Sequence, residues 1–576
     1  MAIATKRTRQ GITVEVMFKK ALESRSMIKD EPSKTQIQIE MAAKLAYAGM
    51  FKKASEFASE IEGAYFRSKA QALIASRLAD AGMFEGASES ASKIEDAYFR
   101  SKAQTSIAAQ LAKAGMDPKK MFEEASESAS KIEYEYFRFK AQASIATKLA
   151  NAGMDPKKMF EEASKSASKI EDAKLRSDAQ ASIAAKLADA GMFEEASKFA
   201  SEIKDAYCRS AGQALIATKL AKAGMDPKRM FEEASESASK IEDAYDRSLA
   251  QATIAVGLAV AGMDSAEMFE TASKSASKIE DAFFRSITQA EIATKLSVAG
   301  MDSTKMFEEA SKSISKIGSR QHAKSIAQAK IASQLVKTWL FEGTASKSAP
   351  NIEDASPRSI VNAGKFETAS KSASEIEDAY IRSIAQAEIA SQLANTGMDP
   401  TEMYKRALVS LFKTENVYNM SPVLETIVTG LAKAGRFEEA SELVSRIERA
   451  DCRLQAQVEI TAELVNADRL EEASNYASEI ETGKYRSKAQ AIIVTGLAKA
   501  GRFEEASELA SKIEHADYRL QAQVETTIEL AKAGRFEGAP EFTFRDPAAK
   551  IRHTINQNKT PRDETTILKD VHRADE

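Results

Sequence analysis

Cysteine and tryptophan are nearly absent from this sequence, which has two cysteines and one tryptophan in 576 residues and only 7% aromatic residues. Two cysteines cannot build a disulfide framework or a four-cysteine zinc site. With so few aromatic residues, the core must be built mainly from alanine, isoleucine and leucine. Apolar runs of about 18 residues are also missing, so we expect no membrane-spanning helix.

A strong charge of one sign is missing too. The 81 Lys and Arg nearly balance the 85 Asp and Glu, for a net charge of −4. This balance argues against a protein held on nucleic acid or anionic lipid by bulk electrostatics. Lys6, Arg7 and Arg9 are not followed by an apolar segment, so we expect no secretory signal. We predict a cytoplasmic or otherwise soluble intracellular protein; non-Sec export, and a targeting role for residues 1–14, stay open.

What the chain does contain is a repeat. The unit at residues 176–208, RSDAQASIAAKLADAGMFEEASKFASEIKDAYC, returns almost unchanged along most of the sequence. An Ala-Gly junction, such as the one at Gly191, marks each unit, and successive junctions are mostly 33 or 38 residues apart. Two units have Trp339 and Asp468 in place of the glycine. A period of this size predicts a solenoid of two-element units.

Each unit contains two amphipathic helical patterns. Ala141, Ile145 and Leu149 share one helical face before Gly153, which suits a helix end at positive φ. A second apolar stripe follows in residues 160–170. Neither helix is long enough to be stable alone, so neighbouring units must stack. We therefore predict an all-α protein, an α-solenoid (superhelix) of about fifteen tandem helix-turn-helix repeats of 33 or 38 residues.

The longer units carry five extra residues after the junction, usually opening with Asp-Pro as in Asp117-Pro118. Asp is a good N-cap and Pro suits the first helical position. Five residues should lengthen the second helix by about 7.5 Å and corrugate one face of the array. Neutral length variation is the interpretation that we favour over a functional shape.

The repeat register divides the chain into five parts. Residues 1–14 are predicted to be a loose N-terminus, 15–319 an N-terminal repeat array, 320–365 degenerate repeats with a bend, 366–539 a C-terminal repeat array, and 540–576 a polar tail. The bend is expected because Pro350 and Pro357 forbid a continuous helix.

The segment Gly191-Met192-Phe193-Glu194-Glu195-Ala196 resembles the G-x-[YF]-x-x-A core of the tetratricopeptide repeat. The match covers roughly residues 17–539, but Gln180 and Cys208 stand where that family has its tryptophan and proline. The resemblance implies a groove lined by the first helix of each unit and a protein or peptide partner. A chaperone-type carboxylate clamp has little support, because it needs Lys and Asn at groove positions that hold small residues here.

Residues 427–444 and 493–510 are similar to the pentatricopeptide repeat, a family that reads single-stranded RNA one base per unit. The resemblance places the following residues at the base-contacting positions: Glu40, Leu73, Ser106, Ser144, Leu215, Thr253, Glu291, Glu388, Thr426, Glu459, Ile492 and Glu525. Five glutamates would repel phosphate, three aliphatic side chains cannot bond a base, and stacking aromatics are absent. RNA binding is therefore the disfavoured alternative.

One position changes repeatedly between otherwise similar units, two residues before each junction. Its members are Tyr47, Asp80, Lys113, Asn151, Asp189, Lys222, Val260, Val298, Asn395, Lys433, Asn466, Lys499 and Lys532. The tetratricopeptide resemblance implies that this variable row lines the groove, so we predict that it selects the partner. The alternative is that the row is an exposed helix end that drifts freely.

An arginine opens the first helix of nearly every unit, and we expect a structural ion pair with the Asp four residues before it, as in Asp96 and Arg100. An arginine ladder for an acidic partner is the alternative. The aromatics before that Arg, such as Phe99, should fill gaps between hairpins. Cys208 and Cys452 occupy the same position and should be small core residues.

No catalytic constellation is visible. His322, His515, His553 and His572 lack metal-ligand or triad spacing, and there is no glycine-rich phosphate loop. We expect no enzyme activity, no catalytic residue, no metal, no cofactor and no membrane insertion. The predicted function is a non-catalytic scaffold or adaptor that binds a protein or peptide through the solenoid groove; the alternative is single-stranded RNA binding.

Overall fold

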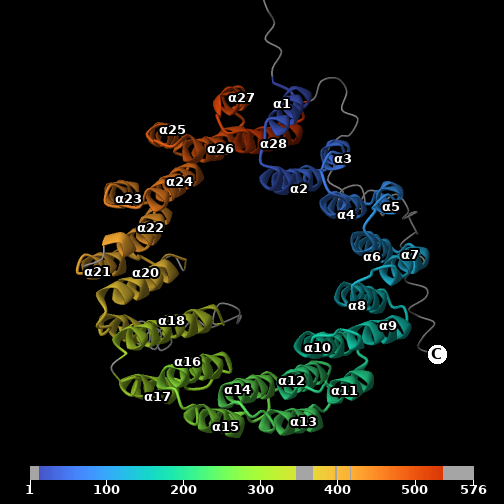
Figure 1. Cartoon of the computed structure of the whole chain (residues 1–576), viewed down its shortest axis with the longest axis vertical. Helices are drawn as coiled ribbons and strands as arrows, with labels where there is room; N and C mark the ends of the chain where they lie inside the picture. The colour runs from blue at the N-terminus through green and yellow to red at the C-terminus, as the bar shows by residue number, and fades with distance from the viewer. Residues whose placement is uncertain (1–11, 319, 346–366, 396–397, 415–416, 536–576) are drawn as a thin grey trace, which may run out of the picture. The chain divides into compact units, whose positions relative to one another are not determined.

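The computed structural model describes residues 12–318, 320–345, 367–395, 398–414 and 417–535. All regular secondary structure in these segments is helical, and the helices follow one another as hairpins (Figure 1). The prediction of an all-α solenoid of tandem helical hairpins is confirmed. The chain forms two compact units. Unit 1 comprises the described parts of Met1–Ser128 and Leu497–Glu576, and unit 2 those of Ala129–Gly496.

The first helices of the hairpins, here called A helices, have 17 residues each, apart from α18 with 25. They are α2 (Glu31–Tyr47), α4 (Ala64–Asp80), α6 (Ala97–Lys113), α8 (Glu135–Asn151), α10 (Ala173–Asp189), α12 (Ala206–Lys222), α14 (Ala244–Val260), α16 (Ala282–Val298), α18 (Gln321–Ala345), α20 (Ala379–Asn395), α22 (Val417–Lys433), α24 (Ala450–Asn466), α26 (Gly483–Lys499) and α28 (Ala516–Lys532).

The second helices, here called B helices, are shorter. They are α1 (Val14–Ser26), α3 (Phe51–Ser59), α5 (Phe84–Ser92), α7 (Lys119–Ser130), α9 (Lys157–Ser168), α11 (Phe193–Ser201), α13 (Lys228–Ser239), α15 (Ala266–Ser277), α17 (Thr304–Ser315), α21 (Thr401–Leu411), α23 (Phe437–Val444), α25 (Leu470–Ser478) and α27 (Phe503–Lys512). Residues 367–374 are helical as well.

The insertion in the longer units lengthens the B helix by less than predicted. Helix α11 of a short unit has 9 residues, whereas α9 and α13 of long units have 12. The prediction of five added helical residues is therefore wrong; three are added, or about 4.5 Å. The other inserted residues form a turn in which the Asp155 carboxylate accepts a hydrogen bond from Lys157 N at 2.9 Å. The helix starts after Pro156 because that carboxylate caps it.

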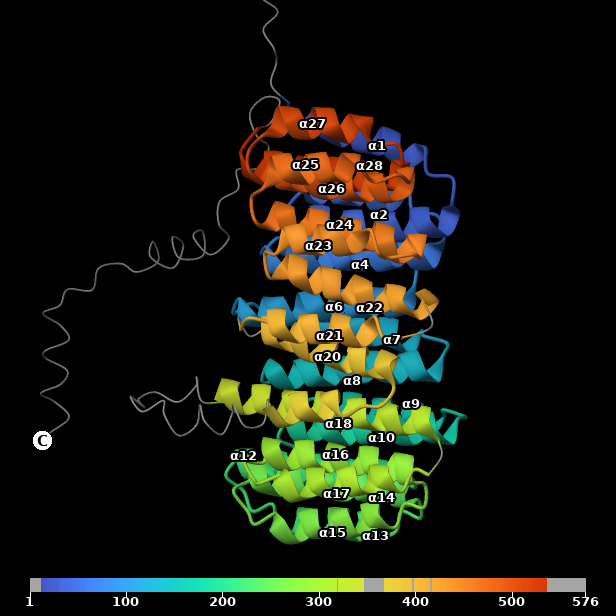
Figure 2. The ribbon, with the colours of Figure 1, turned by 90° about the vertical axis from the view of Figure 1, so that its left-hand side faces the viewer.

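Within each unit the A helices form one layer and the B helices another. Consecutive A helices pack directly on each other, and each B helix packs between its own A helix and the next (Figure 1). Seen from the side, the helices of unit 2 run across the direction of stacking (Figure 2). Small side chains such as Ala217 and Ala234, both fully buried, allow this close approach. In unit 2 the A helices form the inner side of the curve and the B helices the outer side (Figure 1).

The junction glycines take the left-handed conformation that the repeat predicts. Gly191 has φ 76°, and Met192 N donates to Leu187 O at 2.9 Å, which closes the end of α10. Asp468 adopts the same conformation with φ 60°, the only such non-glycine among the described residues. Trp339 marks no junction, because α18 continues through it to Ala345.

The predicted five-part division stays a prediction. Helix α1 begins at Val14 after the N-cap Thr13, but residues 1–11 and 536–576 lie outside the described part. Of the predicted degenerate segment 320–365, α18 covers Gln321–Ala345, and residues 346–365, with Pro350 and Pro357, are likewise outside it. The two compact units divide elsewhere, after Ser128 and before Leu497.

Candidate functional site

The variable row has a simple place in the fold, because each of its thirteen members is the last residue of an A helix. All members are exposed apart from Asn395, whose side chain lies outside the described part. Within each unit the row therefore follows one edge of the A layer. Exposure is what both the partner-selecting interpretation and the free-drift interpretation require, so the function of the row stays a prediction.

Some members of the row are linked across neighbouring A helices. In unit 1 the Arg77 guanidinium bonds the Tyr47 hydroxyl, lies 3.7 Å from the centre of its ring, and pairs with Asp80 at 2.8 Å. The Asp80 carboxylate also accepts a hydrogen bond from Gln110 Nε2 at 2.5 Å. In unit 2 Lys219 pairs with Asp189 of the preceding A helix. These contacts hold the edge of the A layer in one arrangement.

The arginine at the start of each A helix does not form the predicted ion pair. Asp96 instead caps its own helix by accepting hydrogen bonds from Tyr98 N at 2.9 Å and Phe99 N at 3.1 Å. Arg100 Nη1 donates to Ile94 O at 2.5 Å and to Glu95 O at 3.1 Å, while Nε donates to Ser128 Oγ at 3.2 Å. The prediction of a structural role holds, but the partners of Arg100 are carbonyl and hydroxyl oxygens. Arg67 and Arg138 do pair with carboxylates, of Glu95 at 3.3 Å and of Glu135 at 2.9 Å, neither of them four residues before the arginine. An arginine that makes these hydrogen bonds is not available to bind an acidic partner.

The aromatics that precede these arginines only partly fill gaps between hairpins. Phe99 is buried as predicted, but Phe137 and Phe284 are exposed. The gap-filling prediction is wrong for these two side chains.

A patch of large apolar side chains is exposed on four consecutive A helices of unit 2. We call it the A-face patch; its members are between 36% and 53% exposed and are Tyr207 and Leu215 on α12, Val260 on α14, Val298 on α16 and Ile326 on α18. Their positions in the repeat fall on one helical stripe, because Leu215 follows Tyr207 by about two turns. Large apolar side chains exposed on the same stripe of consecutive helices favour an interaction site.

Sequence reasoning missed the A-face patch as a unit. Leu215 appeared only as a residue unsuited to read a base, and Val260 and Val298 only as members of the variable row. The stripe is visible in the repeat alignment once the solvent-facing positions are known. Which positions face solvent depends on how the A helices pack, and that information comes from the structure.

Two tyrosines, on α12 and α14, have carboxylates close to them. Partial burial and the carboxylates of Asp246, in the first turn of α14, and Glu291, in the middle of α16, raise the pKa of Tyr207. Partial burial and the same two carboxylates also raise the pKa of Tyr245. The last turn of α12 carries Lys219 and Lys222, whereas the last turn of α14 carries no basic residue.

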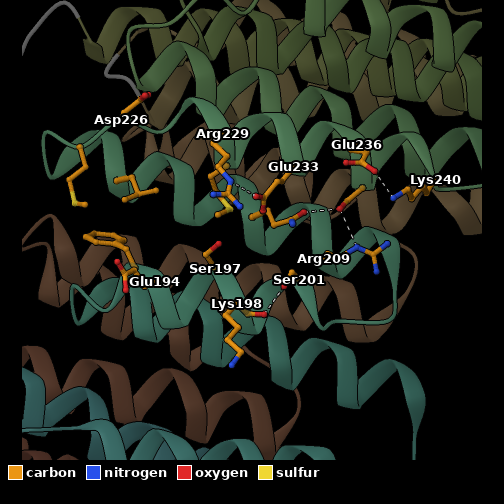
Figure 3. A pocket seen from close by; sticks show the side chains of 16 residues that line it. Glu194, Ser197, Lys198, Ser201, Arg209, Asp226, Arg229, Glu233, Glu236 and Lys240 are labelled. Atoms are coloured by element: carbon orange, nitrogen blue, oxygen red, sulfur yellow. Dashed lines mark hydrogen bonds and ion pairs between the residues drawn. The ribbon is translucent and has the colours of Figure 1, made fainter.

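The B layer of unit 2 carries a cleft of about 770 Å³ beside the short helix α11 (Figure 3). It lies between the short helix α11 and the longer α13 that follows it in the B layer. Its charges are largely paired: Arg229 with Glu233 at 3.0 Å, and Lys240 with Glu236 at 2.8 Å. The cleft therefore presents little uncompensated charge to a ligand, and we propose no ligand for it.

The two cysteines are buried and unpaired, as predicted for small core residues. Burial raises the pKa of the Cys208 thiol, with further contributions from Asp178, which accepts a hydrogen bond from Sγ at 3.1 Å, and from Asp205. Burial and Glu425 raise the pKa of Cys452 to about 11. With their raised pKa values, both thiols stay protonated at neutral pH, so neither is an activated nucleophile.

We expect both cysteines to resist iodoacetamide at pH 8 in the folded protein. A thiol with a pKa of about 11 is only about 0.1% thiolate at that pH, compared with about a quarter for a free cysteine. Intact-mass analysis should show no adduct under native conditions and two adducts in denaturant. Labelling of the folded chain at the denatured rate would contradict this assignment.

The histidines considered in the sequence analysis do not come together in one site. His322 lies 3.5 Å from Asp378 by its Nδ1 and is exposed, His515 is the N-cap residue of α28, and His553 and His572 fall outside the described residues. Over the described part of the chain, no three His, Cys, Asp or Glu side chains are placed to hold a metal ion. No helix of that part is long and apolar enough to cross a bilayer.

Comparison with known proteins gives one family match, the PPR repeat, over residues 425–452, which run from α22 through α23 into α24. No curated protein matches the chain in sequence. Among solved structures, Ton1535 from Thermococcus onnurineus NA1 is 17% identical, with 68% of this chain and 98% of that chain covered and a TM-score of 0.24. Yeast Tom70 is 12% identical, with 84% and 100% covered and a TM-score of 0.23. Cut9–Hcn1, an APC/C hetero-tetramer, is 12% identical, with 88% and 99% covered and a TM-score of 0.22.

The hairpin repeat, its junction glycines and the family match together define the class. This chain is an α-helical repeat protein built of tandem hairpins, and residues 425–452 are similar to the PPR repeat.

Proposed function

We propose that this protein is a non-catalytic scaffold that binds a protein or peptide partner on the A layer of unit 2. The observation that carries the proposal is the A-face patch, five large apolar side chains exposed on four consecutive A helices. Burying such side chains against a partner contributes about 25 cal/mol for each Å² of apolar surface.

A substitution on the A-face patch should remove the partner without unfolding the scaffold. We expect Leu215→Glu to reduce partner capture by the tagged full-length chain at least tenfold, because a carboxylate within the interface would be desolvated. Val409→Glu on helix α21 of the B layer is the matched control, since Val409 is also exposed. Quantitative mass spectrometry of both eluates against the unmodified chain measures the effect. Equal loss in both variants, or in neither, would reject the A-face assignment.

The PPR repeat match over residues 425–452 favours a second candidate, single-stranded RNA. The glutamates at the base-contacting positions count against it, because several are already engaged within the protein. Glu388 accepts a hydrogen bond from Ser333 Oγ at 2.7 Å, Glu459 from Gln455 Nε2 at 2.6 Å, and Glu525 from Lys44 Nζ at 2.5 Å. RNase treatment of the same capture separates the two candidates: protein partners that survive it support the scaffold, and partners that vanish with bound RNA support RNA reading.

A further inference from the structure

Helix α1 lies where the B helix of the α28 hairpin would lie. Both belong to unit 1, and they pack closely against each other although almost the whole chain separates them (Figure 1). Val14 N donates to Arg535 O at 3.0 Å, which joins the start of α1 to the residue that follows the Gly534 junction. Lys20 Nζ donates to Ser507 Oγ of α27, the preceding B helix, at 3.2 Å.

The contact repeats a bond that several hairpins with a long B helix share. In the hairpin of α12 and α13, Arg209 Nε donates to Ser237 Oγ at 3.1 Å, and in that of α20 and α21 Arg382 Nε donates to Ser410 Oγ at 3.1 Å. Arg519 Nε of α28 donates in the same way to Ser24 Oγ of α1, also at 3.1 Å. Helix α1 is therefore bound in the register of a B helix and not by a chance contact.

The sequence of α1 matches that register. Met17, Phe18, Ala21 and Ser24 have the same spacing as Met121, Phe122, Ala125 and Ser128 of the long helix α7. All four α1 side chains are buried. On its other side α1 meets α3, where the rings of Phe18 and Phe57 lie 6.1 Å apart.

The fit of α1 is nevertheless poorer than that of the other B helices. Arg25 stands where α7 has the buried Ala129, and its Nη1 is buried without a hydrogen-bond partner. Gln523 Oε1 is also buried and unpartnered, whereas the equivalent Gln213 accepts a hydrogen bond from Ser237 at 2.8 Å. Two of the four such atoms in the described part of the chain therefore lie at α1 and α28. Unpaired buried polar atoms weaken an interface.

We propose that α28 presents a docking site for a separately supplied B helix, and that α1 of the same molecule occupies it as a releasable latch. Helix α1 is held covalently on the α2 side and only by non-covalent contacts on the α28 side. Its release would expose the apolar side of α28, where Leu520 and Val524 are fully buried. This proposal does not depend on the A-face patch.

Hydrogen exchange of the full-length chain tests the latch. Ala21→Asp places a carboxylate on the fully buried face of α1, and we expect amides of residues 520–531 to exchange at least tenfold faster. Lys19→Asp adds the same group on the exposed face of α1 and should leave α28 unchanged. Amides of α24 serve as an internal reference for global folding. Unchanged exchange in α28, or equally faster exchange in α24, would overturn the proposal.

A cross-link identifies which molecule supplies α1. Lys20→Cys with Ser507→Cys places two thiols where the native side chains touch, and the native cysteines are buried. With a short bismaleimide we expect an intramolecular cross-link in the monomer. Lys20→Cys with Ser88→Cys, on helix α5, should give none. Cross-linked dimers of the first variant at low concentration would show α1 donated by a second copy and would overturn the assignment to the same molecule.

Discussion

Arg209→Ala should destabilise the hairpin of α12 and α13 by about 3 kcal/mol. The guanidinium donates to Ile203 O at 2.5 Å, to Lys204 O at 3.2 Å and to Ser237 Oγ at 3.1 Å. Hydrogen bonds to a charged group are each worth about 1.5–3 kcal/mol, and alanine would leave the half-buried acceptors Ile203 O and Ser237 Oγ without this donor. Hydrogen exchange of α12 and α13 measures the local loss, because repeat proteins unfold in parts.

Two control substitutions separate the geometry of Arg209 from its charge. Arg209→Lys keeps the charge, but one ammonium group cannot reach all three oxygens as a guanidinium does, so we expect most of the loss to remain. Arg229→Ala removes an arginine whose side chain is 90% exposed and should cost less than about 0.5 kcal/mol. If the Arg209→Lys variant were as stable as the unmodified chain, the charge alone would explain the stabilising effect of Arg209.

Gly430→Ala should cost about 2 kcal/mol through overpacking. A Cβ at Gly430 would lie 1.7 Å from the Tyr404 hydroxyl and 2.3 Å from its ring carbon Cζ. Tyr404 is almost fully buried and its hydroxyl lies 3.1 Å from Ser391 Oγ, so the ring cannot simply swing away. Forcing a methyl group into such a site typically costs about 1–3 kcal/mol.

The interpretation of this pair is testable by a double-mutant cycle. Phe160 on α9 and Lys186 on α10 have the same sequence separation as Tyr404 and Gly430, so a Phe in the B helix tolerates a Cβ in the next A helix. Tyr404→Phe combined with Gly430→Ala should therefore cost at least about 1 kcal/mol less than the sum of the single changes. Additive losses in denaturant unfolding would show that the hydroxyl is not what excludes the methyl group.

Much of this fold could be predicted because the same local sequence features recur in many repeats. The 3.6-residue period of Ala141, Ile145 and Leu149 identifies a helix without any knowledge of its partner. Gly153 predicts the left-handed junction that the structure shows at φ 71°. The prediction of the buried Cys208 also follows from its place in the repeat. These features depend on a few neighbouring residues, so a sequence window contains them.

Predictions that depended on three-dimensional neighbours fared less well. The sequence pairs Asp96 with Arg100 by their spacing, but Asp96 prefers its own backbone amides and Arg100 reaches Ser128 in the next helix. The A-face patch was missed for a related reason, because the stacking of helices decides which apolar residues stay exposed.

The sequence by itself determined that this protein is a stack of helical hairpins with glycine junctions and a nearly neutral surface. Only the tertiary structure decided that α1 completes the hairpin of α28, because no local pattern links Ser24 to Arg519. It also decided that Tyr207, Leu215, Val260, Val298 and Ile326 face solvent together. Periodicity fixes the face of one helix, whereas contacts between distant residues are chosen by the packing of the whole unit.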